Sequence, residues 1–158
     1  MNPLRRVRPC AGLLACVLPL AAVAGPTKPP AEPAKIHIEV SPEEVAPGGR
    51  ATVTLQLHPI DGIKINRYPK IKLVIPDQPL LGSPSELQIG NDAPPPPESA
   101  DDNYFKTVDP LELNLQIDGD ASAGKHEIEG KLTYFYCVIA SGFCAPARVP
   151  VKIPVVIR

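Results

Sequence analysis

The sequence predicts an all-β sandwich of about seven or eight strands, formed by a single domain. Apolar residues recur at every second position in several short stretches, which is the period of half-buried strands. Clusters of Pro, Gly and Asp separate these stretches, and no stretch gives a convincing helical period. With 158 residues the chain is long enough for one domain with a hydrophobic core.

The N-terminal residues 1–24 have the pattern of a cleavable signal peptide. Three arginines precede an apolar run that is too short to span a membrane and ends in a small-x-small motif at Ala24. The residues around Cys16 faintly resemble a lipoprotein box, but the apolar run continues beyond this cysteine. We therefore expect cleavage without lipidation, a periplasmic protein and no membrane span in the mature chain.

After the signal peptide, residues 25–34 are predicted to be a Pro-rich extended tether, and residues 35–158 the folded domain. The predicted strands are residues 35–41, 51–57, 63–66, 70–75, 111–117, 126–136 and 149–157. Their inward-facing sets include Ile36, Ile38 and Val40, then Val53, Leu55 and Leu57, then Ile71, Leu73 and Ile75, then Leu111, Leu113, Leu115 and Ile117.

In the last predicted strand, every second residue from Val149 to Ile157 is apolar and faces one side, while Pro150 and Pro154 face the other. Because proline cannot donate to a ladder, we expect this strand to lie at an edge or to run irregularly. Residues 90–106 show no strand pattern and contain four consecutive prolines, so they are predicted to be a long loop of the kind that is functional or disordered.

The composition argues against several classes of function. A formal net charge of -1 provides no basic footprint for nucleic acid. The chain has no nucleophile-elbow, phosphate-loop or dinucleotide motif, so no cofactor is expected. Three scattered histidines, His37, His58 and His126, are interpreted as surface residues, and two cysteines with six residues between them match zinc spacings poorly. No metal site is predicted, although a copper site that mixes these cysteines with a histidine stays open.

The stretch that carries chemistry is the cysteine pair Cys137 and Cys144, which are the only cysteines after the signal peptide. In an oxidising compartment the two can form a disulfide across a hairpin-like tip around Ser141 and Gly142. A bridge over so short a loop contributes only about 2.5 kcal/mol by chain entropy. The residues alone leave open whether the bridge braces the domain or exchanges with other thiols.

The end of the chain resembles the N-terminal periplasmic domain of DsbD-type thiol:disulfide interchange proteins. A strand at residues 130–134 leads to Cys137, and Gly-Phe-Cys-Ala-Pro at 142–146 and Val-Pro-Val at 149–151 follow. Asp-Gly-Ile at residues 61–63 and the acidic-aromatic segment 101–105 are also similar to that family. The likeness covers residues 35–158.

This resemblance implies an immunoglobulin-like sandwich whose cysteine pair relays reducing equivalents between protein partners in the periplasm. It makes Cys137 and Cys144 the redox pair and slightly favours Cys144 as the resolving cysteine. It makes Tyr104 or Phe105 the aromatic cap over the pair. It also makes Asp101 and Asp102 the acidic groups that raise the thiol pKa values by like charge.

The chain departs from the family pattern at Lys64 and Asn66, where aromatic residues are expected, and its cysteine loop is one residue longer. It also lacks the membrane section and the thioredoxin-like domain, so we expect the electron donor to act in trans as part of a disulfide-reductase-type system. The alternative is a non-enzymatic immunoglobulin-like binding module with a purely structural disulfide. A weaker alternative is periplasmic metal handling.

Overall fold

The computed structural model describes residues 30–158, so the predicted signal peptide and the first residues of the tether lie outside the described range. Within it the chain forms nine strands and one short helix. In order these are β1 (Ala34–Ser41), β2 (Glu44–Val45), β3 (Arg50–Pro59), β4 (Ile63–Ile65), β5 (Ile71–Ile75), β6 (Ser85–Ile89), the 3₁₀ helix η1 (Pro97–Asn103), β7 (Leu111–Gln116), β8 (Gly124–Val138) and β9 (Cys144–Ile157).

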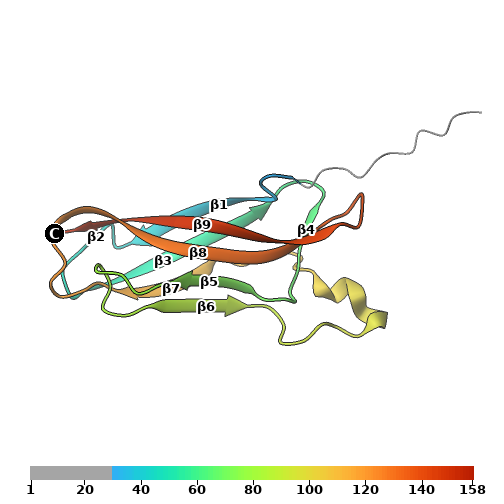
Figure 1. Ribbon diagram of the computed structural model, residues 1–158, viewed down its shortest axis with the longest axis horizontal. Helices are drawn as coiled ribbons and strands as arrows, with labels where there is room; N and C mark the ends of the chain where they lie inside the picture. The colour runs from blue at the N-terminus through green and yellow to red at the C-terminus, as the bar shows by residue number, and fades with distance from the viewer. Residues whose placement is uncertain (1–29) are drawn as a thin grey trace, which may run out of the picture.

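The strands form two sheets packed as a sandwich, which confirms the predicted all-β fold and is consistent with an immunoglobulin-like architecture. One sheet has the order β1-β3-β7, and the other has the order β2-β9-β8-β5-β6 with β4 also paired to β8. Figure 1 shows the long β8–β9 hairpin running the length of the molecule, with its tip and η1 at the end opposite the C-terminus. That end carries both predicted cysteines and the predicted cap.

The core lies between the two sheets, where strict alternation turns one face of each strand inward. Leu55, Leu73, Leu132 and Ile153 are fully buried there. Tyr134 is also fully buried, and its hydroxyl has no hydrogen-bond partner among residues 30–158. Burial raises the pKa of Tyr134 to about 12, so this residue is neutral and acts as core.

Three elements differ from the sequence prediction. β2 and β6 were not predicted, and η1 lies inside the segment predicted to be an irregular loop. β2 is two residues long and pairs parallel with the end of β9, which leaves too few positions for any period. β6 lies at the edge of its sheet and has no fully buried residue, so its alternation is weak.

β9 lies close to an edge of its sheet, as its prolines predicted. In the described chain the only strand on that side is β2, which covers Val156 and Ile157. Three proline pairs lie an even number of residues from the cysteine pair in the β8–β9 ladder, so they are non-hydrogen-bonded pairs like it. These pairs are Phe135–Pro146, Lys131–Pro150 and Glu127–Pro154. Their nitrogens therefore point away from β8, where a missing N–H costs the ladder nothing.

Candidate functional site: a cross-strand disulfide under an aromatic cap

Cys137 and Cys144 form a disulfide at the end of the β8–β9 hairpin, as the sequence predicted. They are the last register pair of the ladder, directly opposite each other, with 4.0 Å between their Cα atoms and an S–S bond of 2.00 Å. Such a close Cα approach is typical of a non-hydrogen-bonded antiparallel pair, where side chains also lie closest. The register alone therefore brings the two sulfurs within bonding distance.

The loop beyond the disulfide is held by its own hydrogen bonds. Val138 N–H donates to the Phe143 carbonyl at 2.7 Å, and Gly142 N–H donates to the Val138 carbonyl at 2.9 Å. Gly142 has a φ of 67°, which a residue without a side chain adopts readily. Fourteen register pairs join the two strands behind it. The hairpin is thus closed by backbone bonds on both sides of the disulfide.

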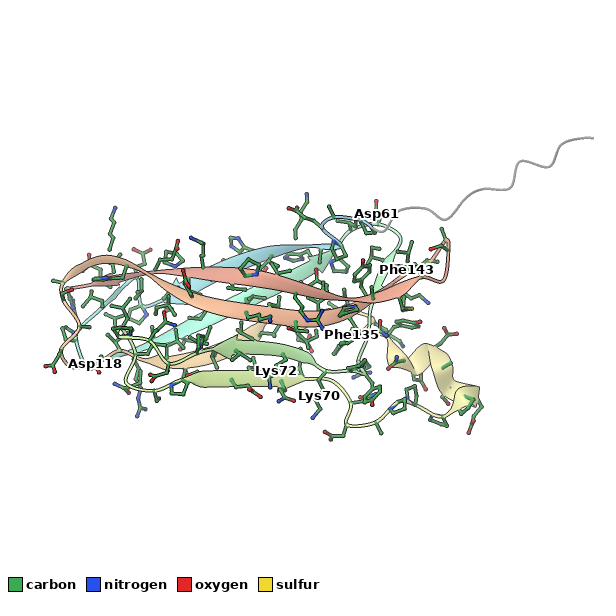
Figure 2. The ribbon with its side chains drawn as sticks, in the orientation of Figure 1. Asp61, Lys70, Lys72, Asp118, Phe135 and Phe143 are labelled. Atoms are coloured by element: carbon green, nitrogen blue, oxygen red, sulfur yellow. A yellow bond between two sulfur atoms is a disulfide. The ribbon has the colours of Figure 1, made fainter. Side chains whose placement is uncertain are left out.

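The two cysteines differ sharply in exposure. Cys137 is only 5% exposed, yet it does not belong to the core cluster between the sheets. Cys144 is exposed to solvent. Cys137 points to the outer face of its sheet, on the same side as Phe135, and must be covered there by other elements. Figure 2 shows Phe143 at the hairpin tip and Phe135 lower on the same strand pair.

One cover is β4 and the residue that follows it. Lys64 is the register partner of Cys137, and Asn66 N–H donates to the Phe135 carbonyl at 2.9 Å. Residues directly opposite each other project to the same face, so the side chains of Lys64 and Asn66 lie beside the disulfide. Asn66 is buried, and its Oδ1 lies 3.4 Å from Cys137 Sγ. In the disulfide this is a sulfur–oxygen contact, because the sulfur carries no proton.

The second cover is the cap segment, residues 103–105, which runs along the outer side of β4. Arg67 N–H donates to the Asn103 carbonyl at 2.6 Å, and Phe105 N–H donates to the Ile65 carbonyl at 2.9 Å. Tyr104 forms an isolated antiparallel bridge with Asn66, so its side chain projects to the disulfide face. Its hydroxyl donates to Cys137 Sγ at 3.6 Å.

The neighbouring aromatic residue has a different position. Phe105 has the opposite parity and packs against the core cluster, and the Arg67 guanidinium lies 5.2 Å from the centre of its ring. Of the two aromatic residues predicted as candidates for the cap, the structure therefore brings Tyr104 to the disulfide and turns Phe105 toward the core. Strand alternation is the reason, since adjacent residues face opposite sides.

The cap segment is anchored by the side chain of Asn103. Its Nδ2 donates to the Tyr68 carbonyl at 3.1 Å, while its Oδ1 accepts from Tyr68 N–H at 3.0 Å. The Asn103 side chain thus pairs with the backbone of Tyr68 as a neighbouring strand would, and it joins the end of η1 to the chain after β4. They fix the residue immediately before Tyr104.

Charged groups surround the cap. The Lys64 ammonium lies 4.7 Å from the centre of the Tyr104 ring and 3.8 Å from Asp101 Oδ1. Asp101 and Asp102 are both exposed on η1. The expectation that these two carboxylates raise the thiol pKa values stays a prediction. The sequence singled out Lys64 only as a departure from the family pattern. The signal for its position is the alternation after Gly62, which puts its side chain on the face of β4 opposite to that of Ile63 and Ile65.

Beyond the cap, an open groove of about 910 Å³ lies between β3, β4 and the residues that follow η1. Its lining includes Leu57, Ile63, Lys64, Arg67, Tyr104 and Phe105. The Lys64 side chain thus borders both the disulfide face and an open surface.

The three histidines interpreted as surface residues form hydrogen bonds with nearby polar groups. His37 pairs with Glu39, His58 with Gln56, and His126 with the Ser122 carbonyl. Residues 30–158 contain no group of three or more His, Cys, Asp or Glu side chains placed to hold a metal ion. Over the same residues, no helix has the length and apolar character needed to cross a membrane.

Comparisons of the chain with known protein families and with curated proteins find no match. What supports a function for this domain is therefore the geometry of the disulfide and its cap.

Proposed function

We propose that this protein is an exported thiol–disulfide exchange domain that relays two electrons between protein partners through a reversible Cys137–Cys144 disulfide. One observation carries the proposal: the two sulfurs of a solvent-facing, cross-strand disulfide have unequal access. Cys144 is exposed, whereas Cys137 is buried outside the core under a hydrogen-bond donor. Exchange needs one sulfur that can be attacked and another that can leave.

The direction of attack follows from this inequality. A partner thiolate attacks Cys144 Sγ, the partner–Cys144 bond forms, the Cys137–Cys144 bond breaks, and Cys137 leaves as a thiolate. The electron pair of the broken bond ends on Cys137 Sγ, where the Tyr104 hydroxyl is in position to donate to it. This order reverses the slight preference for Cys144 as the resolving cysteine, because burial leaves Cys137 out of reach of a partner.

The second step completes the transfer. The remaining thiolate of a dithiol partner attacks its own sulfur in the mixed disulfide, which releases Cys144 as a thiolate and leaves the partner oxidised. The reduced pair then runs the same steps in reverse on a protein disulfide: Cys144 attacks, and Cys137 resolves the mixed disulfide. The domain thereby passes two electrons from a dithiol protein to a disulfide protein.

The sequence supports the same proposal. The signal-peptide pattern of residues 1–24 supports export to the periplasm, a compartment in which disulfides form and persist. The resemblance of residues 35–158 to the N-terminal domain of DsbD-type interchange proteins supports the redox role of the cysteine pair. The donor and the acceptor are then separate periplasmic proteins.

Trapping the mixed disulfide tests the proposal. In Cys137→Ser the exposed Cys144 attacks a partner disulfide but nothing resolves the product, so a covalent complex should accumulate. The matched variant Cys144→Ser keeps only the buried cysteine and should trap nothing. The measurement is non-reducing electrophoresis of periplasmic extracts, with loss of the higher band on adding a reductant. Absence of a complex with both variants would contradict exchange.

A binding module with a structural disulfide is the second candidate, because the hairpin tip exposes large apolar side chains. Ile139 is 58% exposed and Phe143 is 41% exposed, beside the disulfide. A tip of this kind suits a protein contact whether or not electrons pass. The reduction potential separates the two functions: a value below about −300 mV favours the structural disulfide, and a higher value favours exchange.

A further inference from the structure

Lys64 is the charged residue whose position nothing in the proposed exchange has yet used. It is the register partner of Cys137 in the β4–β8 ladder, so its side chain projects to the same face as the buried sulfur. Its side chain is 42% exposed, so the ammonium reaches solvent as well as the cap. A positive charge thus stands on the strand adjacent to the sulfur that leaves when the disulfide opens.

The position of the ammonium is defined from two directions. It lies 4.7 Å from the centre of the Tyr104 ring, within the range of a cation–π interaction. It also lies 3.8 Å from Asp101 Oδ1, at the end of η1. Lys64 therefore contacts the residue that covers Cys137 and the helix that leads into that residue.

We propose that Lys64 is a positioning residue for the exchange reaction: it holds Tyr104 over Cys137 and provides the counter-charge for the Cys137 thiolate. This inference rests on the proposed function and adds to it the reason why Cys137 leaves readily. The charge acts when the S–S bond breaks, because the disulfide is neutral and the departing sulfur is an anion. The Tyr104 hydroxyl supplies the hydrogen bond, and Lys64 supplies the charge.

The groups that face Cys137 from each neighbouring element have opposing effects. From β4 Lys64 favours the thiolate, and from the cap segment the Tyr104 hydroxyl favours it by donation. From η1 the expected effect of the Asp101 and Asp102 carboxylates is the opposite one, and Asp101 Oδ1 lies 3.8 Å from the Lys64 ammonium. From β9 the sulfur of Cys144 is bonded to the partner during the step and carries no charge. Burial of Cys137 and the Asn66 Oδ1 atom 3.4 Å from its sulfur also disfavour the thiolate. Lys64 and Tyr104 oppose these effects, so the sulfur is a better leaving group with them than without them.

Three lysine variants test the inference. Lys64→Met keeps the aliphatic length and removes the charge, while Lys64→Arg keeps the charge. Lys72→Met is the matched control, since Lys72 is 43% exposed, pairs with an acidic residue and lies on β5 of the same sheet. It is opposite Thr133, four residues before Cys137 along β8 and so about 13 Å away.

The primary measurement is the pKa of the Cys137 thiol in a Cys144→Ser background, read from the ultraviolet absorbance of the thiolate against pH. Subtracting the Cys137→Ser/Cys144→Ser spectrum isolates this one thiol from every other cysteine. We expect Lys64→Met to raise the pKa by about one unit, Lys64→Arg to restore it, and Lys72→Met to leave it unchanged. An unchanged pKa in Lys64→Met, or an equal shift in Lys72→Met, would overturn the inference.

The rate of reduction provides a second measurement with both cysteines present. Reduction by a small dithiol should be about three- to tenfold slower in Lys64→Met than in the wild type, because the leaving sulfur is more basic. Neither measurement needs a protein partner. A shifted pKa with no trapped complex would therefore reject the exchange function and keep the role of Lys64, whereas a trapped complex with an unshifted pKa would reject Lys64 alone.

Discussion

Tyr104 and Phe105 are neighbours in the chain, and their side chains lie on opposite sides of the cap segment. Tyr104 reaches Cys137 Sγ with its hydroxyl, and Phe105 packs against the core cluster. Loss of either side chain should therefore have a different effect. Removing Phe105 takes apolar area from the core, while removing Tyr104 uncovers a sulfur and leaves the core intact.

At the residue scale we predict that Tyr104 shields Cys137. In a Cys144→Ser background, Tyr104→Ala should make the Cys137 thiol alkylate about tenfold faster, because a buried thiol becomes accessible. Tyr104→Phe is the control, since it keeps the ring over the sulfur and loses only the hydroxyl, so it should not accelerate alkylation. Peptide mass spectrometry after alkylation reports the modification at Cys137 itself. Equal rates for the alanine and phenylalanine variants would show that the ring is no shield.

The elements around the disulfide hold it in different ways. The β8–β9 hairpin is closed by its ladder, and the prolines on the outer edge of β9 hinder another strand from pairing there. The cap segment has far fewer bonds: its contacts with the chain around β4 include two backbone hydrogen bonds and the two bonds of the Asn103 side chain. The cap should therefore open more easily than the hairpin.

At the element scale we predict that Asn103 controls opening of the cap. Asn103→Ala removes two hydrogen bonds and should cost about 1–2 kcal/mol locally. In the Cys144→Ser background it should speed alkylation of Cys137 several-fold without changing any group that touches the sulfur. Asn114→Ala is a matched control, because Asn114 accepts from the Thr52 hydroxyl at 2.9 Å on the other sheet. An equal acceleration in both variants would mean that general stability, rather than the cap, sets the rate.

The whole molecule is held by the core between its sheets, and the disulfide lies outside that core. Leu113 on β7 and Val151 on β9 belong to opposite sheets and are both buried in the interior. The disulfide closes a loop of only six intervening residues, so its entropic contribution is about 2.5 kcal/mol. Folding should therefore depend on the core much more than on the bridge.

At the scale of the whole molecule we predict opposite outcomes for core and disulfide variants. Leu113→Asp or Val151→Asp should unfold the domain, because each buries an unpaired charge. Cys137→Ser/Cys144→Ser should still melt cooperatively, with a free energy of unfolding reduced by no more than about 2.5 kcal/mol. Thermal unfolding followed by circular dichroism measures both. A double serine variant without a cooperative transition would favour the structural disulfide over exchange.

The amino-acid sequence determines the strands and the disulfide through local patterns. Alternation predicted the strands with the most regular burial, such as β3, β5 and β7, because a half-buried strand repeats every two residues. It missed β2 and β6, which are too short or too exposed to show a period. The turn signal between Cys137 and Cys144 predicted their pairing, since a short hairpin places residues opposite each other.

Only the tertiary structure decides what surrounds the sulfurs. Asn66 and Cys137 are 71 residues apart, and no local pattern states that β4 pairs with the end of β8 in the register that faces Lys64 toward Cys137. The same holds for the choice between Tyr104 and Phe105, which depends on how the cap segment pairs with the chain around β4. Period and turn signals fix which residues share a face of one strand, but register between distant strands depends on the packing of the whole sandwich.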